Sequence, residues 1–199
     1  TMADFKSQGS FGLPHWKNSR AAQELYEPIY LNLFTIQIAL PVGVGSSDEN
    51  TNLLLENVQN ITGLVSHSFP GSPMEQQYKW ATRRFAGAKP DKTTMDIGLT
   101  FEVNLDNNKS AYVLKTLRKW CDLVYDPLTG RTGLKRDYVA SNMLITMYDR
   151  AANPFWQWKC YNVFPISQLP APELAYMSDE HYKIENFTLA VDSWDESII

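Results

Sequence analysis

Apolar and polar residues alternate along residues 94–105, which read TMDIGLTFEVNL. A period of two places successive side chains on opposite faces of a β-strand. One face of the predicted strand is therefore apolar and packs against a core. The other face is polar and carries Asp96, Thr100, Glu102 and Asn104. From the pattern alone, this polar face borders either the solvent outside the protein or the inside of a pore.

Six further segments have the composition and alternation of β-strands, with turn-forming residues between them. They are residues 34–40, 53–61, 76–85, 138–148, 155–163 and 182–192. In the last segment the apolar positions change phase, which predicts a bulge near Glu185 and Asn186. With the strand at residues 94–105, the sequence predicts about seven strands.

The segments at 76–85 and 94–105 are separated by Gly and Pro residues that favour a turn. We therefore predict one long β-hairpin over residues 76–105. Its arms of about ten residues exceed the usual strand length of roughly five or six residues. The hairpin is accordingly expected to project from the body of the domain.

Residues 109–126 have the apolar spacing of an α-helix rather than that of a strand. Val113, Leu117, Trp120 and Val124 recur at intervals of four, three and four positions, and the charged residues lie off this stripe. Such a pattern predicts an amphipathic helix that covers one face of the sheet.

These elements predict a mainly β fold: an antiparallel β-barrel or sandwich of about seven strands with one flanking α-helix and a long projecting hairpin. The length of 199 residues and the high aromatic content fit a single β-rich domain, which we assign to residues 28–199. Residues 1–27 have no sustained period and carry three lone aromatics, Phe5, Phe11 and Trp16. We predict an extended N-terminal arm whose aromatics dock on this domain or on a neighbouring subunit.

Charge is distributed unevenly, although the net charge is only −4. Residues 109–136 contain seven basic residues against two acids, whereas residues 173–199 contain seven acids against one base. The two blocks either are solvated faces or complement each other between copies in a head-to-tail assembly. The basic residues chosen as candidates for such a contact are Arg131, Lys135 and Arg136.

Neither a membrane helix nor an ordinary secretion signal is expected from the sequence. No apolar run approaches the roughly 18 residues of a membrane span, and no basic segment followed by an apolar one stands near residue 1. Cys121 and Cys160 lie in different apolar contexts, without a CxxC motif or nearby histidines, so we interpret them as buried thiols.

Motifs for catalysis, metal binding or nucleotide binding are missing from the sequence. The three histidines are far apart, adjacent carboxylates point in different directions on any regular element, and neither GxxxxGK[ST] nor GxGxxG occurs. We therefore expect no catalytic residue, no metal and no cofactor. The segment YKWATRRF, residues 78–85, suits either base stacking or an interface, and alternation would place Tyr78 and Trp80 on the same face.

The order of these features resembles that of the tail tube proteins of contractile-tailed bacteriophages. The resemblance rests on the arm, on NLF (residues 32–34) entering the first strand after a proline, on the hairpin and on the cover helix. Its sharpest part is YNVFPISQL (residues 161–169) followed by ENFTLAVDSWD (residues 185–195). It covers most of residues 28–195.

The resemblance implies a structural subunit in which six copies form a ring and rings stack into a hollow tube that conducts DNA. It implies that the long hairpin joins strands of other subunits in a barrel around the lumen, and that Asp96, Thr100, Glu102 and Asn104 face this channel. The expected partners are the subunit itself, the tail sheath, a baseplate initiator and a tail terminator, with transient passage of DNA and no membrane. The expected location is the virion tail, assembled in the host cytoplasm.

The predicted subunit interface combines the exposed-aromatic and basic candidates, which are Phe5, Phe11, Trp16, Tyr78, Trp80, Arg131, Lys135 and Arg136. Two alternatives share the architecture: a tube of a related contractile injection machine, such as a type VI or extracellular system, and a protein that initiates the tube. An alternative of another class is a small-molecule-binding β-barrel with an apolar cavity inside one chain. An enzyme is the least favoured class.

Overall fold

The computed structural model describes residues 28–45, 56–66, 73–86, 94–105, 111–177 and 179–199. Within these ranges the elements are β1 (Phe34–Ile38), the 3-10 helix η2 (Val42–Val44), β2 (Val58–Thr62), β3 (Met74–Tyr78), β4 (Ala81–Phe85), β5 (Met95–Glu102), α4 (Tyr112–Val124), β6 (Tyr125–Asp126), β7 (Arg131–Thr132), α5 (Lys135–Tyr138), β8 (Ala140–Tyr148), β9 (Pro154–Pro165) and β10 (Lys183–Ile198). The predicted arm, with Phe5, Phe11 and Trp16, lies outside the described residues.

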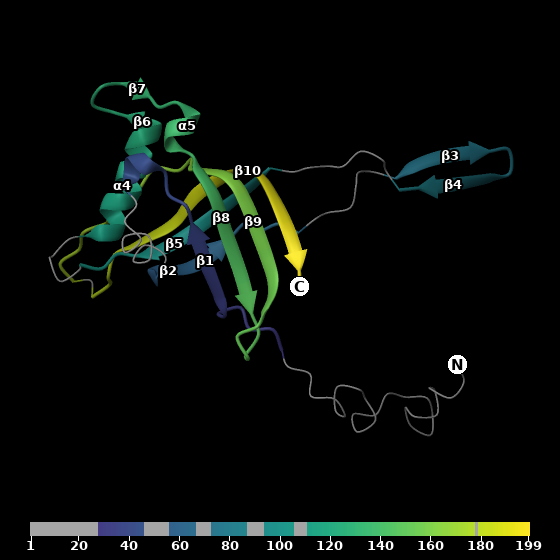
Figure 1. Cartoon of the computed structure of the whole chain (residues 1–199), viewed down its shortest axis with the longest axis horizontal. Coiled ribbons are helices and arrows are strands. Elements are labelled where there is room, and N and C mark those ends of the chain that lie inside the picture. Colours follow the sequence, from purple (N-terminus) through teal and green to yellow (C-terminus); the bar gives the residue numbers. More distant parts are fainter. Residues whose placement is uncertain (1–27, 46–55, 67–72, 87–93, 106–110, 178) are drawn as a thin grey trace, which may run out of the picture.

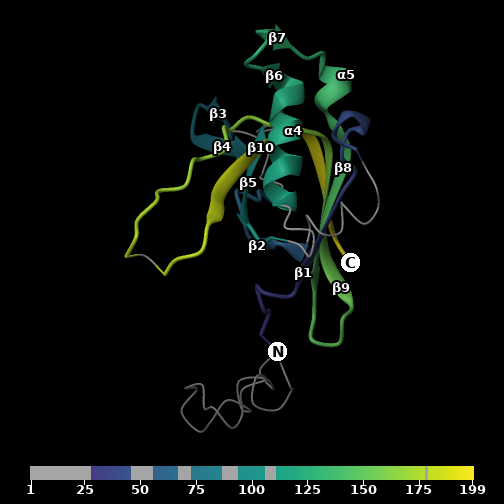
Figure 2. The same cartoon turned by 90° about the vertical axis from the view of Figure 1, so that its left-hand side faces the viewer.

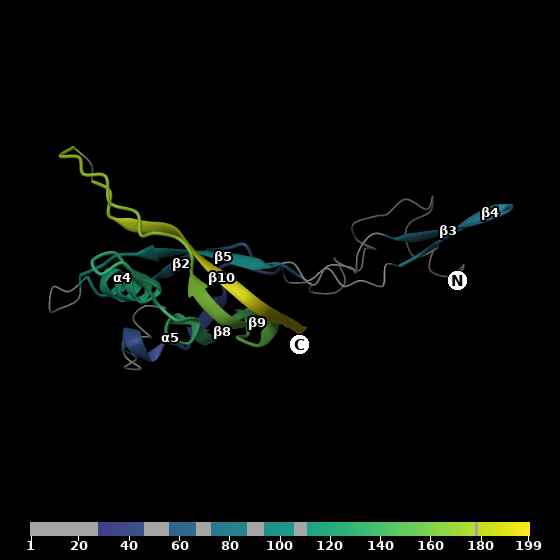
Figure 3. The same cartoon turned by 90° about the horizontal axis from the view of Figure 1, so that it is seen from above.

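Six of the strands form one antiparallel sheet in the order β1-β8-β9-β10-β5-β2. The sheet curls strongly, as Figure 1 and Figure 3 show, so that it resembles half of a barrel. Among the described strands, β1 and β2 occupy its two edges. The predicted mainly β, antiparallel fold is confirmed.

Strand β5 shows how the sequence pattern becomes structure. Met95, Ile97, Leu99 and Phe101 are at most 3% exposed, while Asp96 between them is exposed. The predicted apolar face is therefore confirmed, whereas on the opposite face Asp96 is exposed, Thr100 and Glu102 are partly buried and Gly98 is buried. The strand ends at Glu102, three residues before the predicted end, and the last apolar residue of the pattern, Leu105, is 68% exposed.

The predicted pairing of residues 76–85 with 94–105 is wrong. β3 pairs with β4 in a separate two-stranded hairpin that turns at Lys79 and Trp80, and β5 pairs instead with β2 and β10. In the large sheet the apolar side chains of β5 are buried in the core. Pairing with β4 would not bury them, because every residue of β3 and β4 is exposed. A hairpin does project from the domain, as Figure 1 shows, but it consists of β3 and β4.

Helix α4 lies along one side of the curled sheet, as Figure 2 shows. Val113, Leu117 and Trp120 of the predicted stripe are at most 2% exposed, and the indole Nε1 of Trp120 donates a hydrogen bond to the Tyr138 carbonyl oxygen at 2.7 Å. The predicted cover helix is confirmed. The core thus consists of the inner face of the sheet and one face of α4.

The predicted bulge is confirmed in β10, where the register with β5 shifts between Ile184 and Phe187. Asn186 within the bulge has a φ of 51°, in the left-handed region that a non-glycine residue seldom adopts. The bulge returns Phe187 to the core side, where its ring packs edge-on against Phe101 with centroids 6.3 Å apart.

Candidate functional site

The polar side of β2, β5 and the start of β10 forms a continuous surface, which we call the polar face. Cross-strand register brings its residues together: Glu102 stands opposite Lys183, Thr100 opposite Asn60, and Asp96 opposite Ala190. Opposed residues on antiparallel strands share a face, so three of the four predicted polar residues lie side by side on one surface. The assignment of this surface to a lumen stays a prediction.

Glu102 is the most engaged carboxylate of the polar face. Gln59 on β2 donates a hydrogen bond from Nε2 to its Oε2, and His181 Nε2 lies 3.4 Å from its Oε1. His181 adds positive charge here only when it is protonated. Glu102 therefore organises the residues around it rather than serving as an isolated negative charge.

Gly98 lies directly beneath side chains of both neighbouring strands on the polar face. A Cβ at this position would stand 2.1 Å from Asn186 Oδ1 and 2.5 Å from Thr62 Oγ1. The backbone N–H of Asn186 also points at Thr100 Oγ1, at 3.5 Å. The bulge of β10 thus places the Asn186 side chain across the middle of the polar face, in the space that the missing side chain of Gly98 leaves open.

Asn104 follows the end of β5 and is exposed. Its Nδ2 donates a hydrogen bond to Asn57 Oδ1 at 3.1 Å, which ties the end of β5 to the start of β2. The fourth predicted polar residue therefore adjoins the polar face at its rim.

Sequence reasoning missed Gln59, His181 and Lys183 as members of the polar face. They come from β2 and from the approach to β10, far from β5 along the chain. No local motif marks them, because only the strand order β10-β5-β2 brings them together. The phase change that predicted the bulge was the signal that could have pointed to Asn186.

The predicted aromatic interface residues Tyr78 and Trp80 lie at the tip of the β3–β4 hairpin. Trp80 is 89% exposed and Tyr78 is 50% exposed. They do not alternate along one strand as predicted, because Tyr78 ends β3 and Trp80 belongs to the turn. Both side chains are nonetheless available at one end of the molecule.

The three basic candidates, Arg131, Lys135 and Arg136, lie in β7 and α5. Lys135 Nζ forms an ion pair with Asp192 Oδ2 of β10 and lies 5.3 Å from the centroid of the Phe164 ring. One basic residue of the 109–136 block thus meets one acid of the C-terminal block within the same chain. Arg136 Nε lies 3.5 Å from Oδ1 of its neighbour Asp137, and Arg131 of β7 stands opposite Asp126 of β6 in the strand register. The contact of these blocks between copies stays a prediction.

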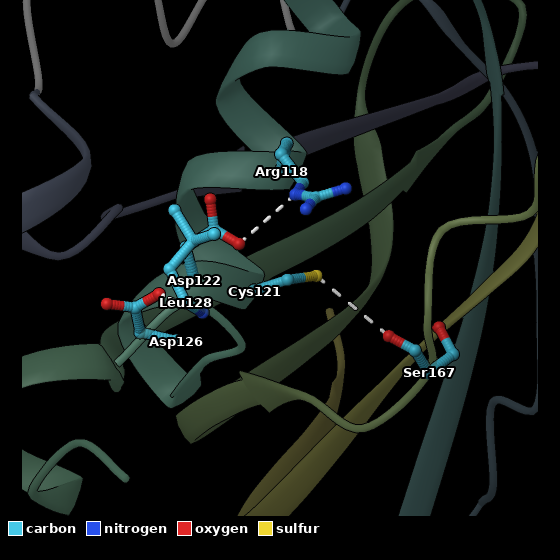
Figure 4. Close-up of polar contacts among 6 residues, drawn as sticks. All are labelled: Arg118, Cys121, Asp122, Asp126, Leu128 and Ser167. Atoms are coloured by element: carbon cyan, nitrogen blue, oxygen red, sulfur yellow. Dashed lines mark hydrogen bonds and ion pairs between the residues drawn. The ribbon is translucent and has the colours of Figure 1, made fainter. Parts of the chain in front are cut away.

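The two thiols have environments that oppose ionisation. Burial raises the pKa of Cys160 to about 12 and, with help from the Asp122 carboxylate, that of Cys121 to about 11. Figure 4 shows Cys121 on α4, its Sγ directed at the Ser167 carbonyl oxygen at 3.9 Å, with Arg118 and Asp122 paired nearby at 3.1 Å. Since the thiolate is the nucleophilic form, both environments lower the reactivity of these thiols.

In the part of the chain that the structure describes, no group of three or more His, Cys, Asp or Glu side chains could hold a metal ion. Within the same residues, none of the helices has the length and apolar character that crossing a bilayer needs.

The sequence matches no protein-family model and no curated protein sequence. The fold, in contrast, is similar to that of chains in solved contractile assemblies. A chain of the anti-feeding prophage cap, described as the AFP tube terminating cap, matches with a TM-score of 0.53 and 14% identity over 88% of this chain and 95% of that one.

Two further similar structures belong to the PVC extracellular contractile injection system in its extended state. A chain of the sheath/tube terminator matches with a TM-score of 0.52 and 16% identity, over 87% of this chain and 99% of that chain. A chain of the sheath–tube complex matches with a TM-score of 0.51 and 14% identity, over 91% and 99%. This chain therefore shares its overall fold with chains of contractile injection assemblies.

Proposed function

We propose that this chain is a non-catalytic structural subunit of the tube of a contractile tail or of a related contractile injection machine. The observation that carries the proposal is the fold likeness, which spans nearly the whole of this chain and of the compared chains. The resemblance of the sequence to phage tail tube proteins supports the same conclusion.

In the proposed tube, six copies form a ring, rings stack head to tail, and the polar face borders the lumen. The character of this face supports the assignment, because Asp96, Glu102 and Glu185 outnumber its single lysine, Lys183. Each phosphate contact with Lys or Arg releases counterions and adds affinity for DNA. A lumen with carboxylates and neutral polar groups would therefore let DNA pass without binding it.

The proposal includes the partners and location that such a subunit needs. The tube would be surrounded by a sheath, started by a baseplate initiator and closed by a terminator, in a virion tail assembled in the host cytoplasm. It also gives a role to the open edges of the sheet. Joining β1 or β2 to other subunits would cover edges that otherwise invite uncontrolled aggregation.

A second candidate is the terminator itself, a ring that closes the tube. The observation that favours it is that two of the three compared structures are described as a tube terminating cap and a sheath/tube terminator. A terminator would form rings that bind the end of an existing tube. A tube subunit would polymerise into filaments.

The binding-barrel alternative has less support from the interior of the molecule. A ligand-binding calyx needs an apolar cavity enclosed by its own sheet. The space beside the inner face of this sheet is instead filled by large buried side chains, among them Phe101 and Met95 of β5 and Trp120 of α4.

Negative-stain electron microscopy of the purified chain in low-salt buffer, with sizing of the soluble fraction, tests the proposal. Hollow filaments are the result expected of a tube subunit, and isolated six-membered rings are the result expected of a terminator. A monodisperse monomer across a wide concentration range, also after addition of preformed rings or tubes of its own system, would overturn both.

A further inference from the structure

The tip of the β3–β4 hairpin combines aromatic rings with positive charge. Lys79 Nζ lies 5.5 Å from the centroid of the Trp80 ring, and the Arg83 guanidinium carbon lies 5.7 Å from that of Tyr78. The carboxylate of this hairpin, Glu75, is paired with Arg84 at 2.7 Å. The tip therefore offers two exposed rings with a cation beside each of them.

The large apolar side chains of this hairpin are more exposed to solvent than is usual for such side chains. Trp80 is 89% exposed and Met74 and Phe85, further along the hairpin, are 62% and 43% exposed. Large apolar groups gathered on one projection mark an interaction surface, and aromatic residues and arginine are the side chains that contribute most at protein interfaces.

A second projection, the loop that follows β9, has the opposite charge. Its residues 170–175 and the residues that lead into β10 line an open hollow, whose walls include Leu174, the acids Glu173, Glu180 and Glu185, and also His181 and Lys183. The hollow adjoins the polar face, with which it shares Lys183 and Glu185. Leu174 is 89% exposed, and Tyr176 and Met177 beside it are almost fully exposed. Leu174, Glu173 and Glu180 of this hollow thus offer one large apolar side chain and two carboxylates, which complement the rings and cations of the hairpin tip.

The two projections lie at opposite ends of the molecule. Figure 3 shows the β3–β4 hairpin at one end of the long axis and the loop between β9 and β10, coloured yellow-green, at the other. The tip of one copy therefore faces away from its own hollow, and a second copy placed end to end would bring tip and hollow together.

We propose that the hairpin tip of one copy docks into the hollow of a second copy of this chain, with Trp80 against Leu174 and with Lys79 and Arg83 facing Glu173 and Glu180. This contact rests on the proposed function as a self-assembling tube subunit, and it names the surfaces that join neighbouring copies. Because tip and hollow are different surfaces, the contact is heterologous and propagates from copy to copy.

The test is a charge exchange in the full-length chain. One variant carries Lys79→Glu with Arg83→Glu, a second carries Glu173→Lys with Glu180→Lys, and a third carries all four changes. The control, Arg150→Glu with Lys159→Glu, changes the net charge as much as the first variant does, at exposed positions outside both surfaces and outside the basic block of residues 109–136. Sedimentation at several concentrations measures self-association, and circular dichroism verifies that each variant is folded.

Each double reversal is expected to weaken self-association at least about tenfold, because it replaces attraction by repulsion across the contact. The fourfold variant is expected to recover most of the loss, and the control is expected to associate as the unmodified chain does. Trp80→Ala should weaken association without altering the salt dependence, since it removes contact area and no charge.

Three outcomes would overturn the docking. Equal association by all variants would do so while leaving the tube proposal intact if rings or filaments still form. Loss in one double reversal without recovery in the fourfold variant would show that the tip meets another surface. Salt-dependent binding of a single-stranded oligonucleotide, lost with Lys79→Glu and Arg83→Glu while self-association persists, would identify nucleic acid as the occupant of the tip. The opposite combination separates the two proposals. If the fourfold variant regains end-to-end association but neither it nor the unmodified chain forms rings or filaments, the docking is supported and the tube is contradicted.

Discussion

Asn186 packs its side-chain amide against Gly98 so closely that a methyl group at residue 98 would stand 2.1 Å from Asn186 Oδ1. Gly98→Ala should therefore lower the free energy of unfolding by about 1 kcal/mol, since the added methyl group displaces the ends of the Asn186 and Thr62 side chains rather than backbone. Urea denaturation measures this change. Asn186→Gly keeps the positive φ accessible and removes the amide, so Gly98→Ala should cost less in that background. Equal costs in both backgrounds would contradict the packing described here.

Trp120 joins α4 to the sheet by burial and by one hydrogen bond. Trp120→Phe should destabilise the fold by about 1–3 kcal/mol, because the Tyr138 carbonyl oxygen loses its donor and some volume is lost. Chemical denaturation followed by circular dichroism measures the effect. Trp80→Phe is the matched control at an exposed position and should change stability by no more than about 0.5 kcal/mol. A similar loss in both variants would rule out a specific role for Trp120.

The buried thiol of Cys160 predicts a dependence of stability on alkaline pH. Its pKa rises to about 12 in the folded chain, so between about pH 9 and 12 the unfolded chain releases a proton that the folded chain retains. The stabilising contribution is complete below pH 9 and is lost as the pH rises through this window. Denaturation at pH 7 and pH 10 should show a larger loss for the unmodified chain than for Cys160→Ala. The folded chain should also react more slowly with a thiol reagent than the unfolded chain does.

Lys135 forms an ion pair with Asp192 of the same chain, whereas Arg131 and Arg136 are candidates for a contact between copies. Variants of the two sets should therefore have different effects. Lys135→Glu should cost at most about 1 kcal/mol of stability, because both side chains are partly exposed. Arg131→Glu with Arg136→Glu should leave stability unchanged and prevent tube growth, if these arginines meet the acidic block of another copy. Denaturation and electron microscopy measure the two effects separately. Unchanged polymerisation in the arginine variant would remove the basic block from the interface.

The polar face can be tested through its charge. Asp96→Arg with Thr100→Arg should give tubes that retain DNA, because the added cations contact phosphates and release counterions. Retention should fall as the salt concentration rises, and Lys159→Arg, which leaves the charge unchanged on another part of the sheet, should behave as the unmodified tube does. Co-sedimentation of tubes with DNA measures the effect. Tubes of the arginine variant that leave DNA entirely in solution would place the polar face outside the lumen.

The sequence predicted elements well where one local period dominates. The alternation of residues 95–102 and the stripe of Val113, Leu117 and Trp120 both report the side that faces the core, and the structure buries the expected residues. The phase change near Asn186 was equally readable, because a bulge alters the local pattern of the strand that contains it.

The hairpin was misassigned because its turn carries no conventional turn signal. Lys79 and Trp80 form the turn between β3 and β4 although neither is Gly, Pro, Asn or Asp, whereas the Gly and Pro residues near 86–91 suggested a turn there. The residues that contact Glu102 from other strands could not be predicted from the sequence, for a different reason. Gln59 and His181 approach Glu102 only because the strand order places β2 and β10 on the two sides of β5.

The described sheet ends in two unlike strands, β1 on one side and β2 on the other. A copy that adds its β1 side to the β2 side of a neighbour leaves a β1 side and a β2 side still open, so addition can continue and always proceeds in the same rotational sense. The angle between the two edges then determines how many copies complete a turn. In that case the curvature of the sheet within one chain would determine the number of subunits in a closed ring.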